Sequence, residues 1–392
     1  MCVMKVVVLG AGLMGKEVAR DLNSSENVEK VFLADIDTTA AQKFVDSLQT
    51  EKIEVLELNA RNEEELRTVM AKGDVCVNAL FYEFNKIVAK TAIEVGVHSV
   101  DLGGHIGEVT EHLLTLHDEA KAKNVTLIPD LGVAPGMINI LAGYGVSKLD
   151  SVESIKLYVG GIPTNPEPPL NYTLVFSLEG VFDHYTEPAK VIQGGKLTEV
   201  QSLSGVEPIY FDHYGVLEAF YTSGGTSTLI NTFPHVKTLE YKTIRYKGHA
   251  DQFKLLNDLG FLSKENIVEV DGQQVLVRDV VREALKKKLD LGDKEDAVLL
   301  RVIVSGEKSG EHVTYEYELN IKRDAKTTMT AMARATACTI ATVAMMVGGG
   351  VIQERGVFPP ESIVPGNEYI EQMAKRGVII KETSHRSTIV KW

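Results

Sequence analysis

Short apolar runs alternate with longer amphipathic stretches through the first third of the chain. The runs near 6–9, 31–35, 53–58, 74–79, 97–102 and 125–130 have the length of buried strands. The stretches that begin near residue 13 and cover 38–48, 63–70, 83–95 and 108–122 have helical spacing. Strands and helices that alternate in this way form a parallel sheet, so the pattern predicts an N-terminal α/β domain of the Rossmann type with a doubly wound, mostly parallel sheet.

The pattern changes after about residue 150. Apolar residues at 155, 157 and 159 alternate with polar ones, which is typical of a strand with one solvated face. Two further alternating runs flank a turn at 307–310 and predict an antiparallel hairpin. A helix of small residues follows at 331–347. We therefore expect a second, α+β domain and a C-terminal segment, with boundaries at 1–135, 136–330 and 331–392.

Composition narrows the class of protein. A length of 392 residues favours two domains, and a net charge of −13 argues against a nucleic-acid partner, because phosphate backbones are bound by clustered Lys and Arg. The three cysteines are far apart and show no metal-ligand spacing, which favours a reducing compartment and no metal site. No signal peptide is evident, and the uncharged stretch 335–352 is interpreted as a buried helix and a turn, not as a membrane span. We expect a cytoplasmic protein.

A glycine pattern follows the first apolar run. Gly10 permits a tight turn, Gly12 removes the side chain that would block a pyrophosphate, and Gly15 lets the next helix pack against the strand. The phosphates would sit near Leu13 and Met14, where free N–H groups and the helix dipole favour negative charge. The alternative is a Rossmann-like unit that binds no dinucleotide.

The second apolar run ends in Asp35, 20 residues past Gly15, where a Rossmann unit places the carboxylate that binds the adenosine ribose. A carboxylate there would repel a 2′-phosphate, so the sequence predicts NAD and not NADP. Ligands of parallel sheets lie beyond the carboxyl ends of the strands. We expect the cofactor crevice to be lined by the residues at those ends, which are Asp35, Asn59, Ala60, Ala79, Leu80, Asp101 and Asp130. For any single acid, the alternative is a helix cap.

Longer motifs are distributed in order along nearly the whole chain. They are VLGAGLMG at 8–15, DLGVAPG at 130–136, YVGGIP at 158–163, PPL at 168–170, YTEPA at 185–189, RYKGH at 245–249, MARAT at 332–336 and GVFPPE at 356–361. With these residues the chain resembles the saccharopine dehydrogenase-like oxidoreductases and, within them, the L-lysine 6-dehydrogenases. The resemblance implies a Rossmann domain, a substrate domain that contributes a dimer interface, and C-terminal helices that return to the Rossmann domain. It also implies NAD-dependent oxidation of the ε-amine of L-lysine to 2-aminoadipate 6-semialdehyde and ammonia, in a homodimer or higher homo-oligomer.

The chain departs from the saccharopine-forming members at two places. Where those tend to have an aspartate before Pro-Gly, this chain has Ala134, and where they tend to have Ser-Pro-Arg-Gly it has Ser-Leu-Glu-Gly at 177–180. An arginine suits an additional substrate carboxylate, whereas a glutamate suits an amine. The hypothesis is that Glu179 lies near the pocket and favours free lysine. The alternative is that Glu179 caps the following helix.

Removal of hydride from the ε-carbon requires a neutral amine, and the lysine ammonium has an ordinary pKa of ~10.4, so a base or a desolvating pocket is needed. Asp130 and Asp101 are candidates because strand ends place them at the crevice, and His105 titrates near neutral pH. Asp130 has the alternative role of ordering the loop 131–136 through its backbone amides. His105 has the alternative of being an exposed loop residue.

For the substrate carboxylate, Arg245 is the candidate, because guanidinium pairs bidentately with carboxylate. Its alternative is an ion pair with a surface acid. His249 either supports Arg245 or packs. Tyr172 and Thr226 are candidates to line the pocket, and the alternative for the glycine-serine stretch that contains Thr226 is a loop.

Two other functions compete with lysine oxidation. One is reductive condensation of an amine with a carbonyl, as in saccharopine or carboxynorspermidine formation, which would favour NADPH and an additional carboxylate site. The other is an NAD-binding sensor or assembly protein that kept the fold and lost the chemistry.

Overall fold

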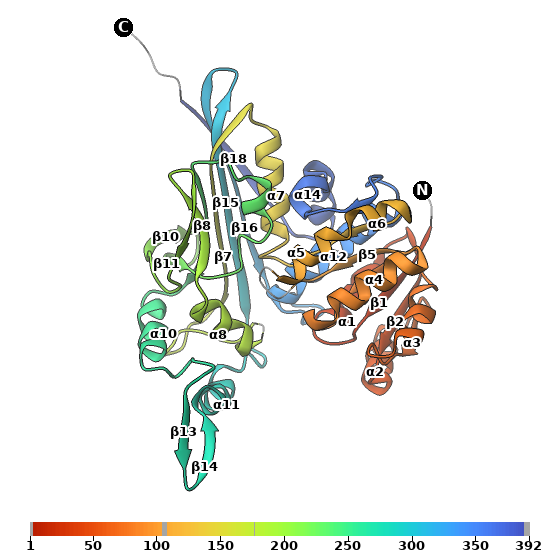
Figure 1. Cartoon of the computed structure of the whole chain (residues 1–392), viewed down its shortest axis with the longest axis horizontal. Helices are drawn as coiled ribbons and strands as arrows, with labels where there is room; N and C mark the ends of the chain where they lie inside the picture. The colour runs from red at the N-terminus through yellow and green to blue at the C-terminus, as the bar shows by residue number, and fades with distance from the viewer. Residues whose placement is uncertain (1–2, 104–107, 176, 388–392) are drawn as a thin grey trace. The chain divides into compact units, whose positions relative to one another are not determined.

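The computed structural model describes residues 3–103, 108–175 and 177–387. By its internal contacts the chain divides into two units. Figure 1 shows the chain coloured by residue number. Unit 1 comprises Met1–Tyr144 and Ala333–Ile380, and unit 2 comprises Gly145–Met332 and Lys381–Trp392. The division differs from the expected boundaries at both ends. The chain leaves unit 1 inside a helix and not at residue 135, and the C-terminal segment is shared, because its last strand pairs with the sheet of unit 2.

Unit 1 contains a seven-stranded parallel sheet in the order β17-β6-β5-β4-β1-β2-β3. Its strands are β1 (Met4–Leu9), β2 (Val28–Asp35), β3 (Ile53–Glu57), β4 (Val75–Asn78), β5 (His98–Asp101), β6 (Thr126–Ile128) and β17 (Gly356–Val357). The order reverses at β1 and β4, which creates the switch point where dinucleotides bind to such sheets. The predicted α/β fold with an N-terminal parallel sheet is confirmed.

The helices of unit 1 connect these strands. They are α1 (Gly15–Ser24), α2 (Thr38–Leu48), α3 (Glu63–Met70), α4 (Asn85–Val95), α5 (Glu108–Thr115), α6 (His117–Ala122) and α7 (Met137–Ser147), with the short 3₁₀ helix η1 (Tyr82–Phe84) and, near the C-terminus, α12 (Ala331–Gly348), α13 (Pro360–Ile363) and α14 (Gly366–Lys375). The single helix expected over 108–122 is two helices, because Leu116 has a non-helical ψ of 7°. The helix expected from about residue 13 begins at Gly15.

Helix α12 is long and apolar enough to cross a membrane by length and composition, but 83% of its window is buried inside the fold. This burial is typical of a core helix, as the sequence predicts.

Unit 2 contains a nine-stranded mixed sheet whose main path is β10-β11-β12-β7-β15-β16-β18, with β8 paired to β12 and β9 to β8. The strands are β7 (Ser151–Pro163), β8 (Ala189–Gln193), β9 (Lys196–Val200), β10 (Glu207–Phe211), β11 (Gly215–Tyr221), β12 (Thr238–Arg245), β15 (Asp296–Lys308), β16 (Glu311–Lys322) and β18 (Lys381–Ser387). The expected hairpin is β15–β16, in antiparallel register from Ala297↔Lys322 to Lys308↔Glu311. A separate hairpin is formed by β13 (Ile267–Val270) and β14 (Gln273–Leu276).

Helices pack against this sheet, and an aromatic-rich core lies between them and the strands. They are α8 (Leu178–Thr186), α9 (Leu229–Thr232), α10 (His249–Asp258) and α11 (Val277–Leu289). The side chains of Phe182 and Tyr185 on α8 pack with Phe220 of β11 and Phe253 of α10 in one buried cluster. Burial of each such aromatic ring removes a large apolar surface from water, so this cluster holds α8 and α10 against the sheet.

Candidate functional site

The turn between β1 and α1 requires glycine at two positions and leaves space at a third. Gly10 has a φ of +92°, and a Cβ at Gly15 would lie 1.8 Å from the carbonyl oxygen of Gly10. A Cβ at Gly12, by contrast, would meet nothing within 4 Å. The first and third glycines are therefore explained by the fold of the turn, whereas the open space at Gly12 is what a bound pyrophosphate needs.

The start of α1 carries no side-chain cap. Met14 is the N-cap residue, and its side chain makes no capping hydrogen bond. Three apolar side chains are exposed just after the ends of adjacent strands: Leu13 after β1 (70% exposed), Ile36 after β2 (71%) and Phe81 after β4 (57%). Uncapped N–H groups and exposed apolar side chains at one edge of the sheet fit the phosphates and the flat rings of a dinucleotide.

Asp35 lies at the end of β2, as expected. Its Oδ2 accepts a hydrogen bond from the Ala11 N–H at 2.6 Å, and its Oδ1 accepts one from the Asp37 N–H at 2.8 Å. The carboxylate thus fixes the glycine turn to the neighbouring strand and keeps lone pairs for a further donor. Its role toward the ribose stays a prediction.

The other predicted crevice residues separate into two groups. Ala79 and Leu80 lie beside the glycine turn, since a Cβ at Gly10 would come within 3.2 Å of both. Asn59 instead forms a local turn, in which its Oδ1 accepts a hydrogen bond from the Arg61 N–H at 3.1 Å. Ala60 is 8% exposed and packs in the core cluster with Leu58 and Leu66. The structure gives these last two residues local structural roles.

Asp101 and Asp130 come together at the ends of β5 and β6. The Oδ1 of Asp101 accepts hydrogen bonds from Gly103 N (2.7 Å), Asp130 N (3.2 Å) and Asn85 Nδ2 (3.2 Å). Burial, followed by the negative charge of Asp130, raises the pKa of Asp101 to about 7. Asp101 therefore exchanges protons near neutral pH, which a general acid or base needs.

Asp130 has the positive φ of 62°, and its two carboxylate oxygens accept from Thr110 Oγ1 at 3.0 and 3.1 Å. A Cβ at Gly103 would lie 2.3 Å from Asp130 Oδ1, so the glycine allows this close approach. His105, the third predicted catalytic residue, lies outside the described residues.

In unit 2, Arg245 is a buried cation without an acidic partner. Arg245 is the last residue of β12 and is 4% exposed. Among the described residues, no carboxylate lies within ion-pair distance of its guanidinium. Its cross-strand neighbour is Glu218, but both oxygens of Glu218 accept from backbone N–H groups of Gly248 and Ala250 at the start of α10. The expected alternative, a surface ion pair of Arg245, is wrong.

Aromatic and polar groups surround the guanidinium of Arg245. Its Cζ lies 4.8 Å from the centre of the Tyr172 ring, its Nη1 donates to the Ile244 carbonyl at 2.8 Å, and its Nε is buried without a hydrogen-bond partner. The hydroxyls of Tyr172 and Tyr185 also interact with the guanidinium. A buried cation that has only neutral partners keeps its charge uncompensated, so this cluster fits a ligand that supplies an anionic acceptor.

His249 supports this cluster as a neutral side chain. Burial, followed by the charge of Arg245, lowers its pKa well below the ordinary value. Its Nδ1 donates to the Leu170 carbonyl at 3.4 Å, so its Nε2 accepts from the Tyr185 hydroxyl at 2.9 Å. Tyr185 lies on α8. Thr226, also predicted to bind substrate, donates to the Lys190 carbonyl of β8 at 3.3 Å and so anchors a loop.

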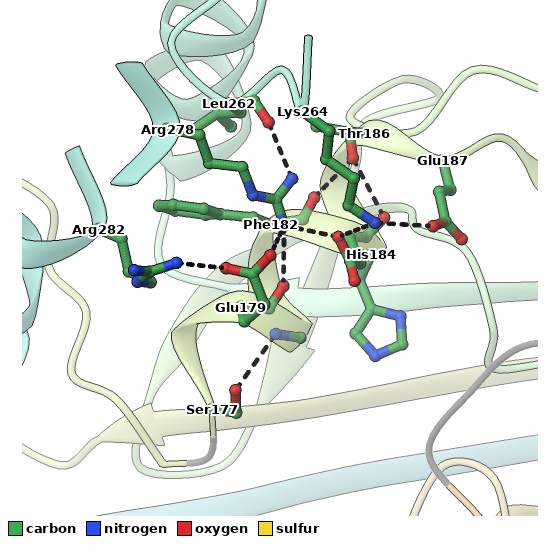
Figure 2. Close-up of polar contacts among 12 residues, drawn as sticks. Ser177, Glu179, Phe182, His184, Thr186, Glu187, Leu262, Lys264, Arg278 and Arg282 are labelled. Carbon is green, nitrogen blue, oxygen red and sulfur yellow. Dashed lines mark hydrogen bonds and ion pairs between the residues drawn. The ribbon is translucent and has the colours of Figure 1, made fainter. Parts of the chain in front are cut away.

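Glu179 belongs to the ion network that Figure 2 shows, in which its cationic partners are Arg278 and Arg282. Arg278 Nη2 of α11 donates to Glu179 Oε1 at 2.7 Å and to Asp183 Oδ1 at 2.6 Å, and Arg282 Nη1 lies 3.4 Å from Glu179 Oε2. The cap of α8 is Ser177, which accepts from the Gly180 N–H. Because two guanidinium groups neutralise Glu179, its charge is not available to select an amine, and the hypothesis about Glu179 is replaced by this structural role.

Arg278 is the important residue that the sequence analysis missed. Its side chain is 2% exposed, and its Nη1 also donates to the Leu262 carbonyl at 2.9 Å. A signal was present, because Glu179 and Asp183 are four residues apart on one helix face and require a shared cation.

Two family models match consecutive parts of the chain. The model of the saccharopine dehydrogenase NADP binding domain matches residues 6–128, and that of the saccharopine dehydrogenase C-terminal domain matches residues 132–378. The chain is 24% identical to saccharopine dehydrogenase [NADP(+), L-glutamate-forming] of Saccharomyces cerevisiae, over 75% of this chain and 66% of that protein.

A second relative is the mitochondrial alpha-aminoadipic semialdehyde synthase of Rattus norvegicus, 26% identical over 67% of this chain; the matched region spans 29% of that protein. The solved apo structure of saccharopine dehydrogenase (L-Glu forming) from Saccharomyces cerevisiae has the same fold, with a TM-score of 0.81 at 19% identity over 97% of this chain and 100% of that one. The matched domains cover both units of the described chain, and the chain belongs to the saccharopine dehydrogenase family of oxidoreductases.

Proposed function

We propose that this protein is an NAD-dependent dehydrogenase that oxidises the ε-carbon–nitrogen bond of L-lysine and releases ammonia. The observation that carries the proposal is the buried, unneutralised guanidinium of Arg245. Among the described Lys and Arg side chains of unit 2 that are buried, Lys242 and Arg278 have carboxylate partners and Arg245 has none. It offers a place for one carboxylate, and lysine brings one.

Unit 1 would hold the dinucleotide. The phosphates would lie over Gly12 at the start of α1, and Asp35 would accept the ribose hydroxyls and repel a 2′-phosphate. When bound, the nicotinamide ring accepts a hydride.

The chain's own residues would orient the substrate and move its proton. Arg245 would bind the α-carboxylate through two parallel N–H donors, and the Tyr172 ring and hydroxyl would complete the wall around it. Asp101 of unit 1, with a pKa of about 7, is the candidate base for an ε-ammonium, and loss of that proton gives the nitrogen lone pair that assists departure of hydride from the adjacent carbon. Water would then add to the imine, and the C–N bond would break to give the aldehyde and ammonia.

A second candidate is the oxidation or formation of saccharopine. The matched relatives favour it, because one is named as an NADP-dependent saccharopine dehydrogenase and the other as an alpha-aminoadipic semialdehyde synthase. Saccharopine adds a dicarboxylate arm to lysine, and unit 2 offers no second buried cation without a partner among its described residues. That charge count favours the smaller substrate.

The test is a matrix of initial rates. Lysine, ornithine and saccharopine are each offered with NAD and with NADP, and reduced cofactor is followed by absorbance while ammonia is assayed separately. Reduction of NAD by lysine with equal release of ammonia supports the proposal. Turnover of saccharopine with NADP and silence with lysine would replace it by the second candidate. Dinucleotide binding without turnover of any amine would indicate a sensor.

A further inference from the structure

Two buried asparagines connect the end of β4 with Asp101. Asn78 is the last residue of β4 and is 1% exposed, and Asn85 is the first residue of α4 and is 3% exposed. Asn78 Nδ2 donates to Asn85 Oδ1 at 2.8 Å, and Asn85 Nδ2 donates to Asp101 Oδ1 at 3.2 Å. Burial of an amide is costly unless its hydrogen bonds are made, so two buried amides in a row need a physical reason.

The helix that Asn85 begins does not supply that reason. Phe84 is the N-cap residue of α4, and no side chain caps that end of the helix. Asparagine is favoured as a cap and disfavoured inside a helix, because its amide competes for backbone hydrogen bonds. The hydrogen bonds that the structure gives the Asn85 side chain lead instead to Asn78 and Asp101. The amide of Asn85 is therefore explained by the carboxylate that it meets.

A backbone group determines which side of each amide faces Asp101. The N–H of Leu80 donates to Asn78 Oδ1 at 3.2 Å, so Asn78 meets Asn85 with its Nδ2. Asn85 then accepts with its Oδ1 and directs its Nδ2 at Asp101. A backbone N–H cannot accept a hydrogen bond, so this order of donors and acceptors does not reverse. Asp101 is thus always met by a donor from the side of α4.

A fixed donor stabilises the ionised form of a carboxyl group. Asp101 depends on such donors, because it is buried and because Asp130, which follows β6, places a second negative charge beside it. Among the described residues, Asp130 is the charged group that acts on Asp101, and the other two donors to Asp101 Oδ1 are the backbone N–H groups of Gly103 and Asp130. The amide of Asn85 is the side-chain donor of this set, so a substitution can remove it.

We infer that Asn85 is a positioning residue for Asp101, held in its donating orientation by Asn78 and the N–H of Leu80. Both asparagines act through Asp101, and neither has to touch a substrate. An amide does not exchange a proton at neutral pH, so the two asparagines control how readily Asp101 ionises and do not conduct its proton. The consequence for catalysis rests on the proposed function, in which Asp101 is the base.

The first experiment measures the ionisation of Asp101 without turnover. The infrared carbonyl band of protonated carboxyl groups is titrated with pH in the full chain, and Asp101→Asn identifies the contribution of Asp101 by removing it. Ordinary carboxyl groups are already ionised near pH 7, so this contribution is isolated. In Asn85→Leu, which loses the amide and keeps much of its volume, we expect the pKa of Asp101 to rise from about 7 by about one pH unit, because a hydrogen bond to a charged group changes such an equilibrium about tenfold.

The control for this titration is Asn23→Leu. Asn23 is an asparagine of α1 whose Oδ1 accepts from Thr50, so the substitution also removes a side-chain hydrogen bond within unit 1. It should leave the titration of Asp101 unchanged. The same pKa of Asp101 in Asn85→Leu as in the wild type would overturn the inference.

A second variant keeps the amide of Asn85 and removes only its orientation. In Asn78→Ala the Oδ1 of Asn85 loses its donor, so the amide is free to turn, and the pKa of Asp101 should rise by less than in Asn85→Leu. This variant also decides the question if Asn85→Leu does not fold. An Asn78→Ala protein that folds normally and titrates like the wild type contradicts the orientation by Asn78.

Steady-state kinetics with lysine and NAD separate this inference from the proposed function. If Asp101 is the base, the rise of kcat/KM with pH should move in Asn85→Leu by the same interval as the infrared titration, so that kcat/KM falls about tenfold below about pH 6 and recovers at high pH. An infrared titration that moves while the kinetic profile does not would uphold Asn85 as a positioning residue and remove Asp101 as the base. A purely structural asparagine would lower the unfolding temperature and move neither curve.

Discussion

Replacement of Arg245 by methionine separates a ligand-binding arginine from a structural one. In the free protein the guanidinium has neutral partners: it donates to the Ile244 carbonyl, interacts with the Tyr185 hydroxyl and stacks over the ring of Tyr172. These contacts contribute about 2–3 kcal/mol together. Against them stands the cost of a buried charge without an acidic partner, which is several kcal/mol. Methionine keeps much of the side-chain volume and removes that charge.

We therefore expect Arg245→Met to unfold at the same temperature as the wild type or at a higher one. Its effect on catalysis should be large, because a bidentate pair with the substrate carboxylate contains two charge-assisted hydrogen bonds. At ~1.5 kcal/mol or more each, their loss lowers kcat/KM for lysine at least about 100-fold. The affinity for NAD should be unchanged. Arg245→Lys keeps the positive charge but loses the bidentate geometry of the guanidinium, so its kcat/KM should lie between those of the wild type and of Arg245→Met.

Thermal unfolding and steady-state kinetics measure both quantities on the same samples. The matched control is Arg301→Met on β15, an arginine that does pair with Glu318 and Glu316. Its unfolding temperature should fall while its kinetics stay normal. If Arg245→Met behaved like this control, losing stability and keeping normal saturation by lysine, Arg245 would be a structural residue and the assignment of the carboxylate site would be refuted.

Three further changes test the other elements. Asp35→Ala should raise the KM for NAD about tenfold or more and narrow the gap to NADP, since it removes a ribose acceptor and the repulsion of a 2′-phosphate; an unchanged ratio of the two KM values contradicts the cofactor assignment. Because the pKa of Asp101 is about 7 and the carboxylate is the basic form, kcat/KM should rise with pH up to about 7 and then level off. In Asp101→Asn this rise of kcat/KM with pH should disappear and kcat/KM should fall about 100-fold. An Asn variant with the same pH profile as the wild type excludes Asp101 as the base. Arg278→Met should lower the free energy of unfolding by about 2–3 kcal/mol, below the usual cost of breaking a buried pair because Glu179 is 43% and Asp183 24% exposed. Burial raises the pKa of Asp183, but the hydrogen bonds and charges of Lys264 and Arg278 outweigh burial, so the pKa of Asp183 is lowered from 3.8. The stability that the Arg278–Asp183 pair contributes is therefore present above about pH 4 and is lost below it. A difference in free energy of unfolding between wild type and Arg278→Met that stays constant in acid contradicts this pairing.

Unit 1 could be predicted from the sequence because its signals are local. Each inner strand is a continuous apolar run, and each ends in a residue that the parallel sheet brings to one edge. That geometry predicts that Asp101 and Asp130 lie close together, and the structure confirms it. The roles of Gly10 and Gly15 in the turn are also predicted by their spacing, whereas that of Gly12 stays a prediction.

Unit 2 could not be predicted to the same depth, because its contacts are between distant segments. Strands β9 and β13 are exposed on both faces, so they carry no alternating pattern of burial to reveal them. The surroundings of Arg245 depend on β11 pairing with β12, and on α8 and α10 meeting above that pair. Sequence spacing indicated the residue types of this cluster, but not that the cross-strand acid Glu218 would bind backbone N–H groups of α10 instead of Arg245.

Helix α8 explains why the hypothesis about Glu179 chose the wrong side chain. On a helix, positions four apart share a face, so Glu179 and Asp183 both face Arg278. Phe182 and Tyr185 are three apart and face the aromatic core, where the Tyr185 hydroxyl bonds the imidazole of His249. Helix α8 therefore connects two groups of residues: the ion network that anchors α11, and the cluster around Arg245. A substitution at position 179 should therefore act on the cluster around Arg245 through the placement of α8 and of Tyr185.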